Sequence, residues 1–207
     1  MRHLKQIFVL AAAIAGLVCM HEAAALEAPD ELVKRVSQEV FDLARADPEI
    51  QAGNTTRVQA LVEARILPHV DFQRMTALAA GRNWRKATPD QQQRLTTEFR
   101  DLLTHVYAGA ISQIRDQEIM FKRMRGSPAD TRVEVRSVVV QSGGAPIQLN
   151  YRLEKHADGW KIYDINILGA WLVQTYRSSF AAQIRKGGID GLIKTLSDKN
   201  QRMASAS

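Results

Sequence analysis

Apolar residues recur at helical spacing through the first half of the chain. The first predicted helix carries apolar side chains three or four positions apart, at Leu32, Val33, Val36, Val40 and Leu43. Asp47-Pro48 closes this helix, a second helix ends before Pro68, and a third covers residues 71–80. The pattern therefore predicts a helical region over residues 28–117.

The longest predicted helix begins at Thr88. The Thr88 hydroxyl can accept a hydrogen bond from a free backbone amide, Pro89 suits the first helical position, and Gln91 stands where a capping box places its returning side chain. The apolar positions that follow form one broad stripe over about six helical turns. They are Leu95, Phe99, Leu102, Leu103, Val106, Tyr107, Ala110, Ile111 and Ile114. One face of this helix is therefore expected to be buried.

After Gln117 the pattern alternates, which predicts a sheet over residues 118–168. The segment "TRVEVRSVVVQ" puts Val133, Val135, Ser137 and Val139 on one side, and "IQLNYRLEK" does the same for Ile147, Leu149, Tyr151 and Leu153. The turn segments "SGGAP" and "HADG" lead from each strand to the next, so the strands are expected to form an antiparallel meander. A shorter strand at 119–124 is expected at its edge.

The strand at "WKIYDINI" has no simply polar face. Strict alternation puts Tyr163, Ile165 and Ile167 on one face and Trp160, Ile162, Asp164 and Asn166 on the other. Helical spacing then returns over 170–198, with a break at Gly187-Gly188, and a polar tail follows at 199–207. The predicted fold class is α+β, with a single domain over residues 26–198.

The first 25 residues are typical of a cleaved secretory signal peptide. Arg2 and Lys5 precede an apolar run, and Ala23-x-Ala25 supplies a small-residue cleavage site. A membrane anchor and a lipoprotein built on Cys19 are the alternatives. Removal of residues 1–25 leaves no cysteine and lowers the formal charge from +6 to +5, because that segment carries two basic residues and one acidic residue. Export argues against a nucleic-acid partner.

The remaining residues offer little catalytic chemistry. His69, His105 and His156 lack metal-binding spacing, and no nucleotide-binding or hydrolase motif is present, so no metal and no cofactor are expected. Asp164 is the best catalytic candidate, because a carboxylate in apolar surroundings can have a raised pKa and act as a base. The favoured alternative is structural: Asp164 binds backbone amides or Arg177.

Four segments together resemble the MlaC-type, or toluene-tolerance, family of periplasmic phospholipid-binding proteins. They are "PHVDFQRMTALAAGRNWRKATPDQQQRLTTEF", "VRSVVVQSGGAPIQLNYRLEK", "DGWKIYDINILGAWLVQTYRSSF" and "GGIDGLIKTL". The landmarks are Trp84 before Ala87-Thr88-Pro89, the strand from Trp160 to Asp164, Tyr176-Arg177 before Phe180, and Gly188 to Leu192. Where the family often has Gly-Val-Ser, this chain has Gly169-Ala170-Trp171.

The resemblance implies a curved, nuclear-transport-factor-like sheet and a helical layer that enclose an apolar cavity for acyl chains. It also implies a carrier rather than an enzyme, located in the periplasm. Such a carrier would move phospholipid between an outer-membrane lipoprotein complex and an inner-membrane ABC transporter with an MCE-domain protein. It would thereby maintain the lipid asymmetry of the outer membrane.

On this reading, apolar residues of the long helix and the sheet are expected to contact lipid. They are Leu103, Tyr107, Ile111, Val139, Leu149, Tyr151, Ile165, Ile167 and Trp171. Arg152 and Lys161 are candidates for headgroup contacts. The alternatives are a carrier of hopanoids or other lipids, a small enzyme that uses Asp164, and a protein-binding adaptor of the cell envelope.

Overall fold

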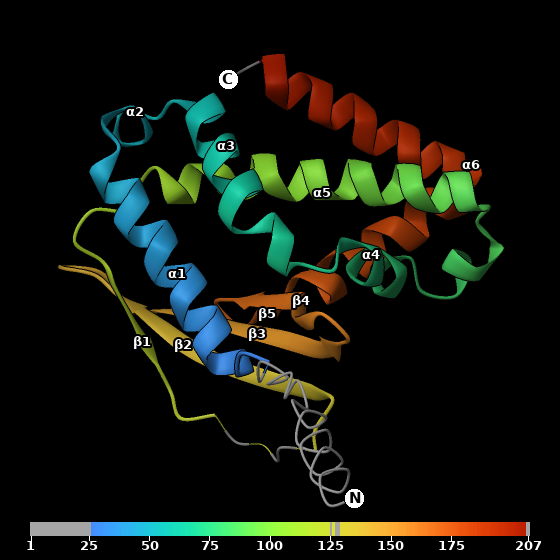
Figure 1. The fold of residues 1–207 in the computed structure, drawn as a ribbon. Coiled ribbons are helices and arrows are strands. Elements are labelled where there is room, and N and C mark those ends of the chain that lie inside the picture. Colours follow the sequence, from blue (N-terminus) through green and yellow to red (C-terminus); the bar gives the residue numbers. More distant parts are fainter. Residues whose placement is uncertain (1–25, 125, 127–128, 206–207) are drawn as a thin grey trace, which may run out of the picture.

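A five-stranded antiparallel sheet lies beneath a layer of helices (Figure 1). The computed structural model describes residues 26–124, 126 and 129–205, so the predicted signal peptide at 1–25 lies outside the described residues. The strands follow one another in sequence order across the sheet, as predicted for a meander. They are β1 (Glu118–Phe121), β2 (Arg132–Val140), β3 (Ile147–His156), β4 (Gly159–Ile167) and β5 (Ala170–Trp171).

Helices precede and follow the sheet in the chain. Those before it are α1 (Pro29–Ala46), α2 (Pro48–Gln51), α3 (Thr55–Arg65), η1 (Leu67–His69), α4 (Phe72–Ala80), η2 (Gly81–Lys86) and α5 (Pro89–Ile111). One long helical segment, α6 (Leu172–Ser205), follows the last strand. This order confirms the predicted α+β class.

The capping box that starts α5 is present. The Thr88 hydroxyl accepts a hydrogen bond from the Gln91 backbone amide at 3.2 Å, and the Gln91 side chain accepts one from the Thr88 amide at 3.1 Å. The predicted stripe is buried in its first half, at Leu95, Phe99, Leu102 and Leu103. Val106, also assigned to that stripe, is instead 39% exposed.

A β-bulge in β4 overturns the predicted assignment of its faces. Leu153 pairs with Ile162 and Tyr151 with Ile165, so Ile162 and Ile165 lie on the same face although three positions separate them. The extra residue breaks the period of two and brings Trp160 and Ile162 onto the face of Ile165 and Ile167. Tyr163 consequently leaves this face, and its ring stacks under the guanidinium of Arg74 at 4.9 Å.

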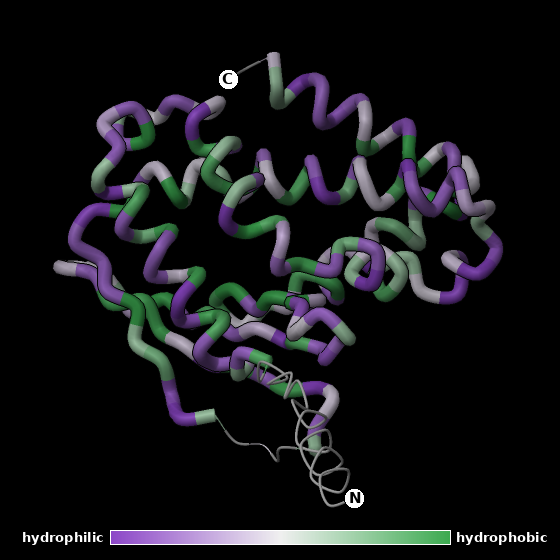
Figure 2. The backbone as a smooth tube through the Cα atoms, in the orientation of Figure 1, coloured by the Kyte–Doolittle hydropathy of each residue, from purple (hydrophilic) through white to green (hydrophobic). Residues whose placement is uncertain are grey.

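Three buried clusters hold the helices to one another and to the sheet. The first joins α4, α5 and α6, where the ring of Phe99 meets those of Phe180 at 5.0 Å and Tyr176 at 4.9 Å. The second packs α1 on the sheet through Val33 and Leu153, and the third joins α1, α3 and α5. Figure 2 shows the hydrophobic stretches along the strands and along the helices over them.

α6 consists of two helices separated by a kink at Gly188, where φ is +67°. This agrees with the predicted break, because glycine enters the left-handed region at little cost. The second helix continues to Ser205, so residues 199–205 of the predicted polar tail are helical. Asn200 anchors this end by donating to the backbone oxygen and the carboxylate of Glu98 at 2.9 and 2.8 Å.

Candidate functional site

A cavity of about 460 Å³ lies between the helical layer and the sheet. It sits where the three buried clusters meet, and none of the residues that line it is charged. The helical wall consists of Val40, Phe41, Val62, Ile66, Leu67, Val70, Phe72, Met75, Leu103, Thr104, Tyr107, Ala108, Ala110, Ile111, Gln113, Ile114 and Leu172. The other wall consists of Gln117, Val139, Gln141, Ile147, Leu149, Tyr151, Ile165, Ile167 and Leu168.

The structure brings together eight of the predicted lipid-contacting residues around this cavity. They are Leu103, Tyr107 and Ile111 from α5, and Val139, Leu149, Tyr151, Ile165 and Ile167 from the sheet. Strand register explains their meeting, because Tyr151 pairs with Ile165 and Leu149 with Ile167 across β3 and β4. Directly opposed side chains share a face of an antiparallel pair.

Two tyrosines, Tyr107 and Tyr151, belong to the cavity wall. Burial raises the pKa of both Tyr107 and Tyr151, and for Tyr151 hydrogen bonds with Ser37 and Ser137 oppose the shift. Both phenols are therefore neutral near neutral pH. The cavity presents hydrocarbon and neutral hydroxyls, which suits an uncharged, apolar guest.

The polar and exposed lining residues gather at one end of the cavity, which we call the rim: Ala110, Gln113, Gln117, Gln141 and Leu168. Glu118 pairs with Val140, which places the neighbouring Gln117 and Gln141 together at this end of the sheet. Leu168 is 69% exposed and has a positive φ of 51°.

Arg152 and Trp171 do not lie at the cavity. Arg152 stands between Tyr151 and Leu153, which both face the helices, so alternation turns it to the opposite face of the sheet. Its guanidinium stacks on the Trp171 ring at 3.6 Å and lies 3.4 Å from the Asp164 carboxylate. Trp171 therefore supports the outer face of the sheet rather than the cavity mouth.

Lys161 is also remote from the rim. Its ammonium donates to the backbone oxygen of Pro68 at 3.1 Å and pairs with Asp158 at 3.0 Å. Lys161 lies six positions before Ile167 along β4, a span of about 20 Å. The structure thus brings neither cationic candidate to the open end of the cavity.

Asp164 has the structural role that the sequence favoured. Its side chain accepts hydrogen bonds from the backbone amides of Ile165 and Val173, both at 3.0 Å, and so ties the start of α6 to β4. Its ion-pair partner is Arg152, not Arg177 as expected. Burial raises the pKa of Asp164, but this carboxylate faces away from the cavity and meets no guest there.

The curved sheet, its helical layer and the uncharged cavity define an α+β protein built around an apolar binding space. No helix in residues 26–124 and 129–205 is long and apolar enough to cross a bilayer. The family model described as "MlaC protein" matches residues 34–198. The chain therefore belongs to the MlaC family.

Curated relatives and a solved structure agree with this membership. The chain is 22% identical over 188 residues to the "Intermembrane phospholipid transport system binding protein MlaC" of Haemophilus influenzae, which covers 89% of this chain and 88% of the relative. It is 25% identical to the "Toluene tolerance protein ttg2D" of Pseudomonas putida, over 83% and 80% of the two chains. A phospholipid-binding protein from Ralstonia solanacearum, solved in complex with a phospholipid, has a TM-score of 0.81 and 42% identity, over 84% of this chain and 98% of that one.

Proposed function

We propose that this protein binds a phospholipid and carries it through the periplasm. The observation that carries the proposal is the cavity of about 460 Å³ with no charged lining residue, in a chain 42% identical to a protein solved with a phospholipid. The volume falls within the roughly 300–1,000 Å³ typical of ligand pockets. The eight predicted residues that line the cavity are the proposed contacts of the acyl chains.

The hydrophobic effect supplies the binding energy in this proposal. Each methylene removed from water contributes about 0.8 kcal/mol, so ten buried methylenes contribute about 8 kcal/mol before the cost of ordering the chain. A charged lining residue would reduce this gain, because it would lose its hydration to the hydrocarbon. The uncharged wall therefore matches an acyl chain better than a polar substrate.

The headgroup is proposed to remain at the rim. A phosphate inside the cavity would be a charge without a partner, whereas at the rim it stays hydrated. Gln113, Gln117 and Gln141 can offer amide donors there without fixing a particular headgroup. Arg152 and Lys161 have no part in this proposal, because both lie away from the rim.

We further propose a shuttle role without catalysis, between an outer-membrane lipoprotein complex and the MCE-domain protein of an inner-membrane ABC transporter. This transport would support the lipid asymmetry of the outer membrane. The names of the relatives, which refer to intermembrane phospholipid transport and to toluene tolerance, support this role.

Lipid extraction from protein purified without detergent tests the proposal. Mass spectrometry should find phospholipid in a fixed ratio to protein, and the protein should move a fluorescent phospholipid between vesicle populations. Hopanoid as the only bound lipid would replace phospholipid as cargo. A lipid-free protein that takes up no phospholipid would refute the proposal.

A further inference from the structure

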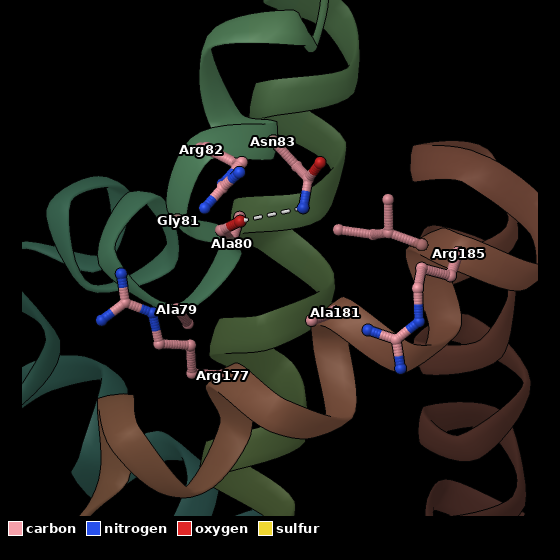
Figure 3. A pocket seen from close by; sticks show the side chains of 9 residues that line it. Ala79, Ala80, Gly81, Arg82, Asn83, Arg177, Ala181 and Arg185 are labelled. Atoms are coloured by element: carbon pink, nitrogen blue, oxygen red, sulfur yellow. Dashed lines mark hydrogen bonds between the residues drawn. The ribbon is translucent and has the colours of Figure 1, made fainter.

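A second hollow, of about 550 Å³, lies between the end of α4 and the first half of α6. We call it the arginine groove, and Figure 3 shows its lining. Arg82 and Asn83 form one wall, and Arg177, Ala181 and Arg185 come from α6. Ala79, Ala80, Gly81 and Ile184 complete the lining. The groove thus differs from the lipid cavity in combining three guanidinium groups with small side chains.

The chain concentrates positive charge at this groove. Residues 72–89 and 165–189, which contain both walls, include seven Lys or Arg residues and no Asp or Glu. Three of the seven line the groove, whereas Arg74 is paired with Glu154 at 2.8 Å. None of Arg82, Arg177 and Arg185 forms an ion pair with a carboxylate of the described residues. The acidic residues that follow these segments, Asp90 and Asp190, already lie 3.5 and 3.7 Å from Arg94.

The backbone at Gly81 lets one wall approach the other. Gly81 has a φ of +58°, and a Cβ at this position would lie 3.4 Å from the guanidinium of Arg177. A larger residue would be strained by the dihedral angle and would also crowd the arginine. Arg177 therefore packs against the backbone of η2 at Gly81, while its side chain remains exposed at the groove.

We propose that the arginine groove binds an acidic, extended segment of a partner protein. Guanidinium groups match carboxylates with paired donors, and arginine clusters are a recurring way to recognise acidic motifs. The small side chains of Ala79, Ala80 and Ala181 leave room for a peptide backbone. The three arginines would then each find the anionic partner that the described residues do not supply.

The position of the groove favours a protein partner over a membrane. Phe180, next to Ala181, packs on Phe99 at 5.0 Å, and Phe99 precedes Ala110 of the rim by eleven residues of α5, about 16 Å. A partner in the groove therefore leaves the rim open. This step rests on the proposed function, in which lipid enters and leaves at the rim.

Fluorescence anisotropy with labelled hexaglutamate as the probe tests the groove. The protein should bind hexaglutamate but not hexaglutamine at low salt, with an affinity that falls as salt is added. Arg177→Glu with Arg185→Glu should weaken binding about tenfold or more. Lys155→Glu, a charge reversal at an exposed strand position, is the matched control and should change it less than about twofold.

Three results would overturn the proposal: equal losses in the groove and control variants, displacement of the peptide by millimolar inorganic phosphate, or groove-dependent binding of anionic vesicles in place of the peptide. If the double variant does not fold, the single variant Arg185→Glu replaces it and should also weaken hexaglutamate binding. Lipid content is measured on the same samples. Retained lipid with lost peptide binding supports the groove alone. Absence of lipid from every sample, together with no uptake of phospholipid, refutes the carrier and leaves the peptide result standing.

Discussion

Replacement of Ile165 by tryptophan should obstruct the lipid cavity without unfolding the protein. Ile165 lines the cavity from β4, opposite Tyr151 on β3, and it is only partly buried because its side chain borders the open space. An indole there would cover on the order of 100 Å² of wall that an acyl chain could otherwise bury. At about 25 cal/mol per Å², this costs about 2.5 kcal/mol of binding free energy, or a factor of about 70 in affinity.

The assay is lipid content per mole of protein after detergent-free purification, together with uptake of a fluorescent phospholipid. Val140→Trp is the matched control, because Val140 is 39% exposed and neighbours Val139, which lines the cavity, on the other face of β2. We expect Ile165→Trp to lose most bound lipid and Val140→Trp to keep it. Equal lipid content and uptake in Ile165→Trp and the unmodified protein would show that the acyl chains do not occupy this space.

Three further predictions concern stability. Asp164→Ala leaves the amides of Ile165 and Val173 without an acceptor and should cost about 1–3 kcal/mol, measured by urea unfolding. Burial raises the folded-state pKa of Asp164 above its unfolded value of about 3.9, so ionisation of this carboxylate weakens the fold as pH rises through the folded pKa. Asp164→Asn should therefore gain stability relative to the unmodified protein above about pH 4. A difference in unfolding free energy between the two proteins that does not change with pH would contradict this. Thr88→Ala removes the capping box of α5 and should cost about 1 kcal/mol, whereas Thr88→Ser should keep most of it in the same measurement.

The sequence predicted the local elements well because their signals are local. The capping box at Thr88, the alternation in β2 and β3, and the break at Gly188 each depend on residues a few positions apart. The β4 bulge escaped prediction, because "WKIYDINI" reads as a regular alternation and the extra residue shows only in the pairing with β3. That irregularity decides that Trp160 and Ile162 join the inner face.

For the candidate site, too, the local pattern predicted some residues and long-range contacts decided the others. The eight lining residues could be named from apolar periodicity and the family resemblance, because each faces a predicted core. Arg152, Lys161 and Trp171 could not be placed, because their contacts depend on long-range packing. Strand pairing and the return of the chain after β4 bring Arg152, Asp164 and Trp171 together, and the packing of η1 on β4 brings Pro68 to Lys161. The rim was missed as well, since its residues come together only at one end of the sheet.

The amino-acid pattern by itself determined an α+β chain. It predicted a long helix with one buried apolar face, an antiparallel meander, and apolar side chains that face inward from both. The family resemblance implied that the inward-facing apolar side chains enclose a space; tertiary structure decided which residues line that space and where it opens. The physical reason is that burial depends on side chains from α1, α3, α5 and three strands at once. Whether the side chains of these elements fill the interior or leave a cavity depends on how they pack together, which no single segment encodes.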